Sequence, residues 1–315
     1  MKQIKIAAIG CPSDYQHGLL VAVLKSLAYH VEWVKPIAAD LVIFGSFINP
    51  EKRKRWIPKI IRPYTLAAQE KIYDYFSLRK YKPITLFHTA ENLRHNHLPA
   101  DYSISFDLGV KDSHHYRLPY WMEMIDWSHE GITGNLNPRY GELLSIKKLT
   151  QPLGNNFLRR NNEAVIFSSH IREPRLSLIK SIESFIKLRK YGAIFDESIK
   201  NHHLSNFLKK DILLNFSYNL CPENGLYPGY VTEKIPEAFH SGCLPITWID
   251  DNVRCDFNPN AFINLAPETW NNFEQIKIIL SSVENLESFS DQALLESEPT
   301  ISNYVFFLKK LLENK

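Results

Sequence analysis

Residues 221–235 combine the residue types and the spacing that suit binding of an anion. Apolar and aromatic residues predict a buried strand over 213–220, and the glycines and prolines after it predict a loop. Thr232 is then predicted as the N-cap of a helix, with Glu233 in its first turn and Lys234 beside it. Free N–H groups at a helix start, next to a lysine, suit a phosphorylated ligand. The alternative is an ordinary capped helix with Lys234 in solvent.

Two other charged residues accompany predicted strand ends. Glu91 follows a strand predicted over 83–87, where α/β folds place catalytic groups. Arg175 stands at the start of a helix predicted over 176–188, where the helix dipole disfavours a cation unless an anion is near. This position indicates a phosphate partner for Arg175, although a surface arginine fits the spacing equally well.

The histidines around Glu91 suggest a metal site, but their spacing argues against one. His88, His95 and His97 do not form the H-E-x-x-H pattern, and loop histidines are more often solvated. The two aspartates at 250–251 are adjacent rather than alternating, so we interpret them as a turn. We therefore predict no metal site.

Six segments of the chain occur in an order that is typical of one enzyme family. They are Phe87-His-Thr-Ala-Glu-Asn92, Asp101-Tyr-Ser-Ile-Ser-Phe-Asp107, Arg117-Leu-Pro-Tyr-Trp121, Glu223-Asn224, Tyr230-Val-Thr-Glu-Lys-Ile235 and Gly242-Cys-Leu-Pro-Ile246. This ordered string resembles the family-10 glycosyltransferases of bacterial type, the α-1,3/1,4-fucosyltransferases. The resemblance covers about residues 84 to 265.

The resemblance implies an α/β fold of GT-B architecture, with two Rossmann-like domains facing across a cleft. We expect an acceptor-binding domain over residues 1–155 and a GDP-sugar-binding domain over 156–300. Residues 301–315 are apolar at helical spacing and are expected to form a helix that packs back on the first domain. The opening residues fit this fold, since they predict a strand over 2–9, a helix over 18–29 and a strand over 40–44.

The resemblance also implies an activity: inverting transfer of L-fucose from GDP-β-L-fucose to a GlcNAc hydroxyl, which makes an α-1,3 linkage. Glu91 takes the family's general-base position, and Arg175 and Lys234 are expected to neutralise the diphosphate. No cofactor is expected to be obligatory, and a divalent ion such as Mn²⁺ is expected at most to stimulate. The donor contacts implied by the match are Ser169, Arg175, Asn224, Tyr230, Thr232, Glu233 and Lys234.

The chain departs from the family pattern near the expected donor pocket. His170 stands where Asn is usual, Ser217 where Lys is usual and Pro222 where Phe is usual, and residues 249–251 replace a glycine-containing turn. These departures leave open another GDP-deoxyhexose donor or a different acceptor. A glycan-binding protein without transfer activity is a second alternative, and a structural α/β domain is a third.

Composition narrows the class of protein. The chain has 315 residues, 44% hydrophobic and 23% charged, which suits two globular domains. A net charge of +3 gives no indication of nucleic-acid binding. The four cysteines lack CxxC or zinc spacing, so we interpret them as free thiols of a reducing compartment. No apolar run reaches the roughly 18 residues of a membrane span.

Residues 51–62 interleave basic and apolar side chains. One interpretation is a patch that contacts an anionic membrane surface, and the alternative is a solvated face. With the resemblance, these features lead us to expect a cytoplasmic protein at the inner face of a bacterial membrane, acting on Lewis-type lipopolysaccharide glycans. The acceptor, the choice between α-1,3 and α-1,4 linkage, and the oligomeric state stay open.

Overall fold

A computed structural model describes residues 2–47, 83–192, 194–195, 208–266 and 273–313. The chain forms two units, each an α/β structure with a parallel sheet. The N-terminal unit comprises Met1–Leu118, Glu130–Asn135 and Ile301–Lys315. The C-terminal unit comprises Pro119–His129 and Leu136–Thr300. The basic segment 51–62 lies outside the described residues.

The division between the units falls at Leu118, not at the expected residue 155. Hydrogen bonds explain why most of residues 119–155 belong to the C-terminal unit. The indole nitrogen of Trp121 donates to Asp256 at 3.2 Å, and the amide of Asn137 donates to Glu237 at 3.0 Å. The weak sequence pattern near residue 155 therefore marks a connection inside the second unit.

The N-terminal unit is built on six parallel strands in the order β2-β1-β3-β4-β5-β6. The strands are β1 (Lys2–Ile9), β2 (Tyr29–Trp33), β3 (Leu41–Phe44), β4 (Ile84–His88), β5 (Tyr102–Ser105) and β6 (His115–Arg117). The strand β3 is buried along its whole length, as its unbroken apolar sequence predicts. The chain order reverses between β1 and β3, so these two strands flank the switch point of this sheet.

The first helix, α1 (Leu19–Ser26), is shorter than the predicted helix over 18–29. The backbone turns at Ala28, which has a φ of 62°, and Tyr29 begins β2. β2 is an edge strand whose residues are exposed or half-buried, and no strand was predicted there from the sequence.

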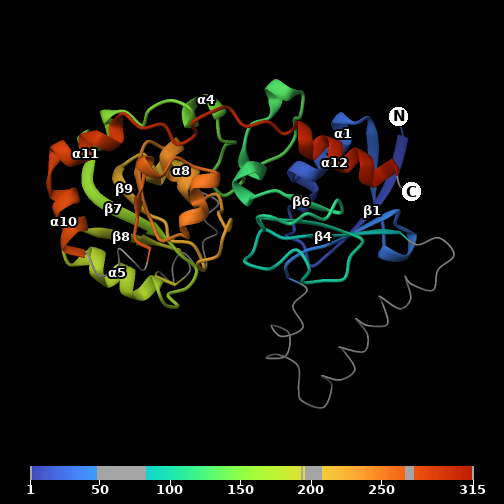
Figure 1. The fold of residues 1–315 in the computed structure, drawn as a ribbon, viewed down its shortest axis with the longest axis horizontal. Helices are drawn as coiled ribbons and strands as arrows, with labels where there is room; N and C mark the ends of the chain where they lie inside the picture. Colours follow the sequence, from blue (N-terminus) through green and yellow to red (C-terminus); the bar gives the residue numbers. More distant parts are fainter. Residues whose placement is uncertain (1, 48–82, 193, 196–207, 267–272, 314–315) are drawn as a thin grey trace, which may run out of the picture. The chain divides into compact units, whose positions relative to one another are not determined.

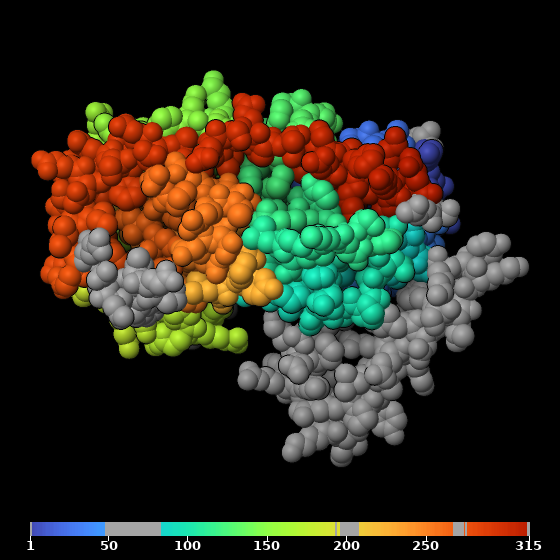
Figure 2. Space-filling view, viewed as in Figure 1, coloured from blue at the N-terminus to red at the C-terminus, as the bar shows by residue number. Residues whose placement is uncertain are grey.

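Helix α12 (Ser302–Glu313) packs within the N-terminal unit. The ring of Tyr304 lies 5.3 Å from that of Tyr116. The carboxylate of Glu130 accepts hydrogen bonds from the backbone N–H of Ile301 and the hydroxyl of Ser302, each at 3.0 Å. In the space-filling view, α12 (red) lies against the blue and teal parts of this unit (Figure 2).

The C-terminal unit is built on five parallel strands in the order β11-β10-β9-β7-β8. The strands are β7 (Asn161–Phe167), β8 (Leu188–Tyr191), β9 (Phe216–Leu220), β10 (Leu244–Thr247) and β11 (Ile263–Asn264). The α-helices are α4 (Ile146–Leu149), α5 (Arg175–Glu183), α7 (Lys209–Leu213), α8 (Lys234–His240), α10 (Phe273–Ser281) and α11 (Val283–Ser290). Figure 1 shows α5 beside the strands and α10 next to α11.

Short 3-10 helices connect these elements. They are η1 (Tyr15–His17), η2 (Pro36–Ala38), η3 (Tyr120–Met124), η4 (Ser128–Glu130), η5 (Asn155–Arg159), η7 (Asp251–Cys255) and η8 (Pro259–Ala261). Asp250 caps η7 by accepting a hydrogen bond from the backbone of Asn252 at 2.9 Å, which confirms the turn predicted at 250–251.

Two predicted boundaries in the C-terminal unit were wrong. The helix predicted over 176–188 ends at Glu183, because Leu188 is buried as the first residue of β8. The strand predicted to begin at residue 213 begins at Phe216, since Leu213 ends α7.

The chain order of the C-terminal sheet reverses between β7 and β9. The buried amide of Asn219 on β9 donates to the carbonyl of Val165 on β7 at 2.8 Å and ties the two strands together. Because open α/β sheets bind ligands outside the carboxyl ends of strands at such a switch point, the loops after β7 and β9 are where a ligand is expected.

We predict that protonation of His240 destabilises the C-terminal unit. His240, at the end of α8, lies 2.8 Å from the hydroxyl of Tyr140, and burial lowers its pKa to about 4. As the pH falls below about 6.5, the unfolded chain takes up the proton first, so stability present above that pH is lost toward pH 4. The loss between pH 7 and 5 should be about 2 kcal/mol.

Urea unfolding at several pH values measures this loss. A His240→Gln variant should show a shallower dependence on pH, whereas His30→Gln, at an exposed position of β2, should match the wild type. Equal pH slopes for His240→Gln and the wild type would contradict the prediction.

Candidate active site

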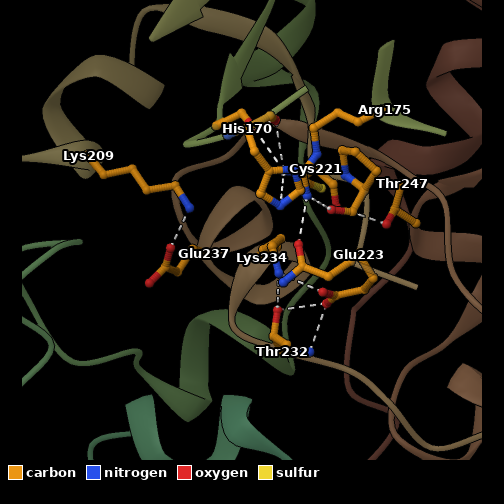
Figure 3. Close-up of polar contacts among 12 residues, drawn as sticks. His170, Arg175, Lys209, Cys221, Glu223, Thr232, Lys234, Glu237 and Thr247 are labelled. Atoms are coloured by element: carbon orange, nitrogen blue, oxygen red, sulfur yellow. Dashed lines mark hydrogen bonds and ion pairs between the residues drawn. The ribbon is translucent and has the colours of Figure 1, made fainter. Parts of the chain in front are cut away.

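The predicted donor residues of the C-terminal unit gather in the loops that follow β7 and β9 (Figure 3). The loop after β7 leads to Arg175 at the start of α5. The loop after β9 carries Asn224 and Tyr230 and ends at Lys234, the first residue of α8. The structure thus brings residues separated by some fifty positions to one edge of one sheet, as parallel topology requires.

Arg175 is buried and held by neutral partners, so the alternative of a surface arginine was wrong. One guanidinium nitrogen donates to Oγ of Ser168 at 2.7 Å. The other donates to Oδ1 of Asn224 at 2.9 Å and to the carbonyl of Pro222 at 3.3 Å. Burial lowers the pKa of Arg175, and the charge of Glu223 opposes that shift. A guanidinium stays charged in proteins, so the site holds a fixed positive charge.

The loop after β7 differs in detail from the expectation. Ser168 contacts Arg175, and the neighbouring Ser169, which was predicted as a donor contact, is exposed. The ring of His170 also lies against the guanidinium, with Nε2 at 3.2 Å from Nη1. Burial and the charge of Arg175 both lower the pKa of His170, which favours a neutral ring beside that cation.

Glu223 organises the loop after β9, a role that the sequence analysis did not assign to it. This residue is 2% exposed. Oε1 accepts from the backbone N–H of Thr232 at 2.8 Å and from its hydroxyl at 2.7 Å. Oε2 accepts from Nζ of Lys234 at 2.6 Å. One carboxylate therefore closes the loop from residue 223 to residue 234.

The predicted helix start was wrong by one residue. Glu233 occupies the N-cap position of α8, and no side chain caps the helix there. The hydroxyl of Thr232 instead donates to Glu223 and accepts from the ammonium group of Lys234. A local sequence pattern does not reveal this competing acceptor, which is nine residues away in the chain.

Lys234 is a fixed ammonium group and not a solvated one. Its side chain is 20% exposed, and Nζ also donates to Oγ1 of Thr232 at 2.7 Å. Burial by itself lowers the pKa of Lys234, but the charges of Glu223 and Glu233 raise it well above its ordinary value. Tyr230 is buried and Asn224 is exposed, so the predicted donor residues include both supporting and accessible side chains.

Glu91 belongs to the N-terminal unit and lies in the loop after β4. Thr89 fixes this loop, because its hydroxyl accepts from the backbone N–H of Glu91 and donates to its carbonyl, each at 3.1 Å. The hydroxyl of Ser46 lies 2.8 Å from that of Thr89 and links the loop to the end of β3. Glu91 as a residue is half-buried.

The neighbouring histidines take part in separate contacts. Nδ1 of His88 lies 2.6 Å from the hydroxyl of Tyr15, and Nδ1 of His95 lies 3.3 Å from the buried carboxylate of Asp107. The ring of His97 lies 5.8 Å from that of Phe87. Across the described parts of the chain, no three metal-ligating side chains converge.

Two further features concern the protein's environment. All four cysteines, Cys11, Cys221, Cys243 and Cys255, are free thiols, as their spacing predicted. Among the helices that the structure describes, none has the length and apolar character needed to cross a bilayer.

Two family profiles match the chain. The profile described as glycosyltransferase family 10 (fucosyltransferase) C-term matches residues 158–294. The profile described as alpha-(1,3)-fucosyltransferase FucT N-terminal domain matches residues 42–124. A curated relative, alpha-(1,3)-fucosyltransferase FucT of Helicobacter pylori, is 25% identical over 226 residues. The match covers 67% of this chain and 45% of the relative, so it spans less than half of the relative's length.

Solved structures show the same fold. One described as the crystal structure of alpha1,3-fucosyltransferase aligns over 100% of this chain and 91% of its own, with a TM-score of 0.67 and 21% identity. Another, described as that enzyme with GDP-fucose, covers 100% of this chain and 92% of its own, with a TM-score of 0.66 and 18% identity. The expected α/β fold of GT-B type is confirmed. The two profiles together match segments in both units, and the motifs quoted above also lie in both. The chain therefore belongs to glycosyltransferase family 10, the fucosyltransferases.

Proposed function

We propose that this protein is an inverting α-1,3-fucosyltransferase, which moves L-fucose from GDP-β-L-fucose to a hydroxyl of GlcNAc in a glycan. The observation that carries the proposal is the pair of cations at the switch point of the C-terminal sheet, the buried Arg175 and the half-buried Lys234, each held by hydrogen bonds. The name of the Helicobacter pylori relative and the description of a similar structure with GDP-fucose support this choice of donor.

Arg175 and Lys234 neutralise the diphosphate in this proposal. Negative charge grows on the leaving GDP in the transition state, and pre-positioned cations stabilise it without reorganisation. Their hydrogen bonds to Ser168, Asn224 and Glu223 supply the required rigidity. Because two protein cations face the diphosphate, the proposed reaction needs no obligatory divalent metal, and Mn²⁺ would at most stimulate it.

The remaining predicted residues hold the nucleotide sugar. Glu233 carries a carboxylate that can accept hydrogen bonds from sugar hydroxyls. Asn224 is exposed beside Arg175 and can bond the donor while it orients the guanidinium. Tyr230, Thr232 and Ser169 complete the proposed donor contacts, with Thr232 acting through its bonds to Glu223 and Lys234.

Glu91 acts as the general base in the proposed reaction. The acceptor oxygen attacks the anomeric carbon of fucose from the face opposite GDP, and its proton passes to the Glu91 carboxylate. The bond between the anomeric carbon and the β-phosphate oxygen breaks, and GDP leaves with the electron pair. Attack from the opposite face inverts the anomeric centre. The fixed loop of Thr89 supports this role by orienting the backbone of Glu91.

A second candidate keeps this mechanism with another GDP-deoxyhexose or a different acceptor. The contact between His170 and Arg175 favours it, because this departure from the family pattern lies at the donor site. The departure at Ser217 supports this second candidate less strongly. Ser217 is buried in β9, and its hydroxyl donates to the carbonyl of Phe157 at 2.6 Å. A glycan-binding protein without transfer activity is a less favoured alternative, because it needs no diphosphate-binding cations.

We also propose that the protein works in the cytoplasm at the inner face of a bacterial membrane, on lipopolysaccharide glycans of Lewis type. Sequence features outside the described residues support this proposal, chiefly the basic and apolar segment 51–62. Sedimentation with vesicles of acidic and of neutral lipids distinguishes membrane contact from a solvated face.

Release of GDP from GDP-fucose tests the proposed function directly. We expect release that depends on N-acetyllactosamine and persists in EDTA, because Arg175 and Lys234 supply the positive charge. The assay compares reactions with and without acceptor, in EDTA and then with Mn²⁺. Tight GDP binding without release would favour the second candidate, and absence of GDP binding would contradict the proposal.

Substitutions at Glu91 and Arg175 should affect different steps. Glu91→Gln should lower kcat by two or more orders of magnitude, about the size of a general-base contribution, with donor affinity unchanged. Arg175→Ala should lower kcat by a similar factor and also weaken GDP binding, because the diphosphate loses a charge partner. Steady-state kinetics and calorimetry of GDP binding measure both effects. Weakened GDP binding in Glu91→Gln would contradict its role as the base.

Loss of the Glu223 carboxylate should destabilise the fold. Glu223→Ala leaves the ammonium group of Lys234 without its carboxylate partner and the N–H of Thr232 without its acceptor, at a cost of about 3 kcal/mol in unfolding free energy. Glu163→Ala is the matched control, since Glu163 pairs with the exposed cations Lys187 and Arg189 and should cost about 1 kcal/mol or less. Urea unfolding measures both, and equal losses would contradict the assigned role of Glu223.

A further inference from the structure

The ring of His170 contacts Arg175 in the candidate site but has no role in the mechanism above. Nε2 lies 3.2 Å and Nδ1 3.4 Å from Nη1 of the guanidinium group, and Figure 3 shows the two side chains together. The carbonyl of His170 accepts a hydrogen bond from the hydroxyl of Ser168 at 2.5 Å, and that hydroxyl accepts from the same Nη1. The three residues therefore form one connected group between β7 and α5.

Each terminal nitrogen of Arg175 already contacts two residues. Nη1 contacts Ser168 and His170, and Nη2 contacts Asn224 and Pro222. A terminal guanidinium nitrogen carries two N–H bonds, so a diphosphate can bond one of these nitrogens well only where a present partner moves aside. Ser168 and Pro222 are buried, whereas Asn224 is exposed and His170 is half-buried. The donor therefore reaches these nitrogens past Asn224 and His170.

Three cations act on the ring of His170. They are Arg175 on α5, Arg172 in the same loop as His170, and Lys234 on α8. Burial lowers the pKa of His170 and these charges lower it further, while a hydrogen bond with Asn224 opposes the shift. The ring is therefore neutral near pH 7 and can accept a hydrogen bond from Nη1. A diphosphate brings negative charge to this place and favours the protonated ring, because an opposite charge within about 4–6 Å stabilises the charged form.

We propose that His170 is a third diphosphate-binding residue, which takes up a proton when the donor binds. The proton passes from the solvent to the ring nitrogen that accepts from Arg175 in the free protein. Both ring nitrogens then carry N–H groups, so the ring turns from the guanidinium group to phosphate oxygens and leaves an N–H of Arg175 for the same ligand. This inference rests on the proposed function, in which Arg175 faces the diphosphate.

The affinity for GDP-fucose as a function of pH tests this assignment. GDP-fucose is the suitable probe, because the terminal phosphate of free GDP titrates by itself near pH 6, as phosphate monoesters do. We expect calorimetry to show about tenfold tighter binding at pH 6 than at pH 8, since uptake of one proton strengthens binding by at most about tenfold per pH unit. Titrations at pH 7 in buffers of different ionisation enthalpy should show net proton uptake.

Substitution of His170 separates this role from a purely structural one, which would change Tm but not the pH dependence of binding. His170→Asn keeps a polar side chain that can accept from Arg175 but that takes up no proton near neutral pH. This variant should bind GDP-fucose like the wild type at pH 8, without stronger binding at pH 6. His240→Gln is the matched control, because His240 is a buried histidine of the same unit outside the loops after β7 and β9. It should keep the pH dependence of the wild type.

Each outcome decides the proposal. Wild-type pH dependence in His170→Asn would overturn it, and so would loss of that dependence in His240→Gln, which would assign the proton to another site. If His170→Asn does not fold, the wild type decides, because net proton uptake supports the proposal and binding without uptake overturns it. Wild-type protein that binds no GDP-fucose at any pH would overturn the proposed function and this inference with it. Binding that is independent of pH would overturn only the role of His170.

Discussion

The buried carboxylate of Glu223 is the interaction on which the candidate site depends. It accepts from the backbone and hydroxyl of Thr232 and from the ammonium group of Lys234. A loop containing Gly225, Pro228 and Gly229 has little regular structure of its own, so this single acceptor determines where α8 begins. A cation that is placed before any ligand arrives does not need to be reorganised when negative charge develops.

Charge balance is the second constraint, since the edge of the C-terminal sheet concentrates ionised groups. Cations and carboxylates lie among one another there, and a buried charge is tolerated only with a partner. These groups are Arg175, Lys234 and Lys209 among the cations and Glu223, Glu233 and Glu237 among the carboxylates. Arg175 differs from the two lysines because neutral oxygens hold it, which leaves its charge less compensated.

Topology explains why these groups meet. In each unit the strand order reverses once, and parallel strands direct their carboxyl ends to one edge. The loops after β7 and β9 meet at this edge in the C-terminal unit, and the loop after β4 carries Glu91 at the corresponding edge of the N-terminal sheet. In both units, polar side chains therefore lie in the loops at the carboxyl ends of the strands, where backbone N–H groups can hold them rigidly.

The sequence by itself determined the fold class, the family and the charged residues, because motif order and apolar periodicity are local properties. It predicted the strands near 2–9, 40–44 and 83–87 closely. Tertiary structure decided the hydrogen-bond partners and the boundaries. The sequence predicted Thr232 as a helix cap. Only the folded chain brings Glu223 close enough to accept a hydrogen bond from the hydroxyl of Thr232. Likewise, contacts made by Trp121 and Asn137 assign their segments to the C-terminal unit, because packing between distant residues outweighs local composition.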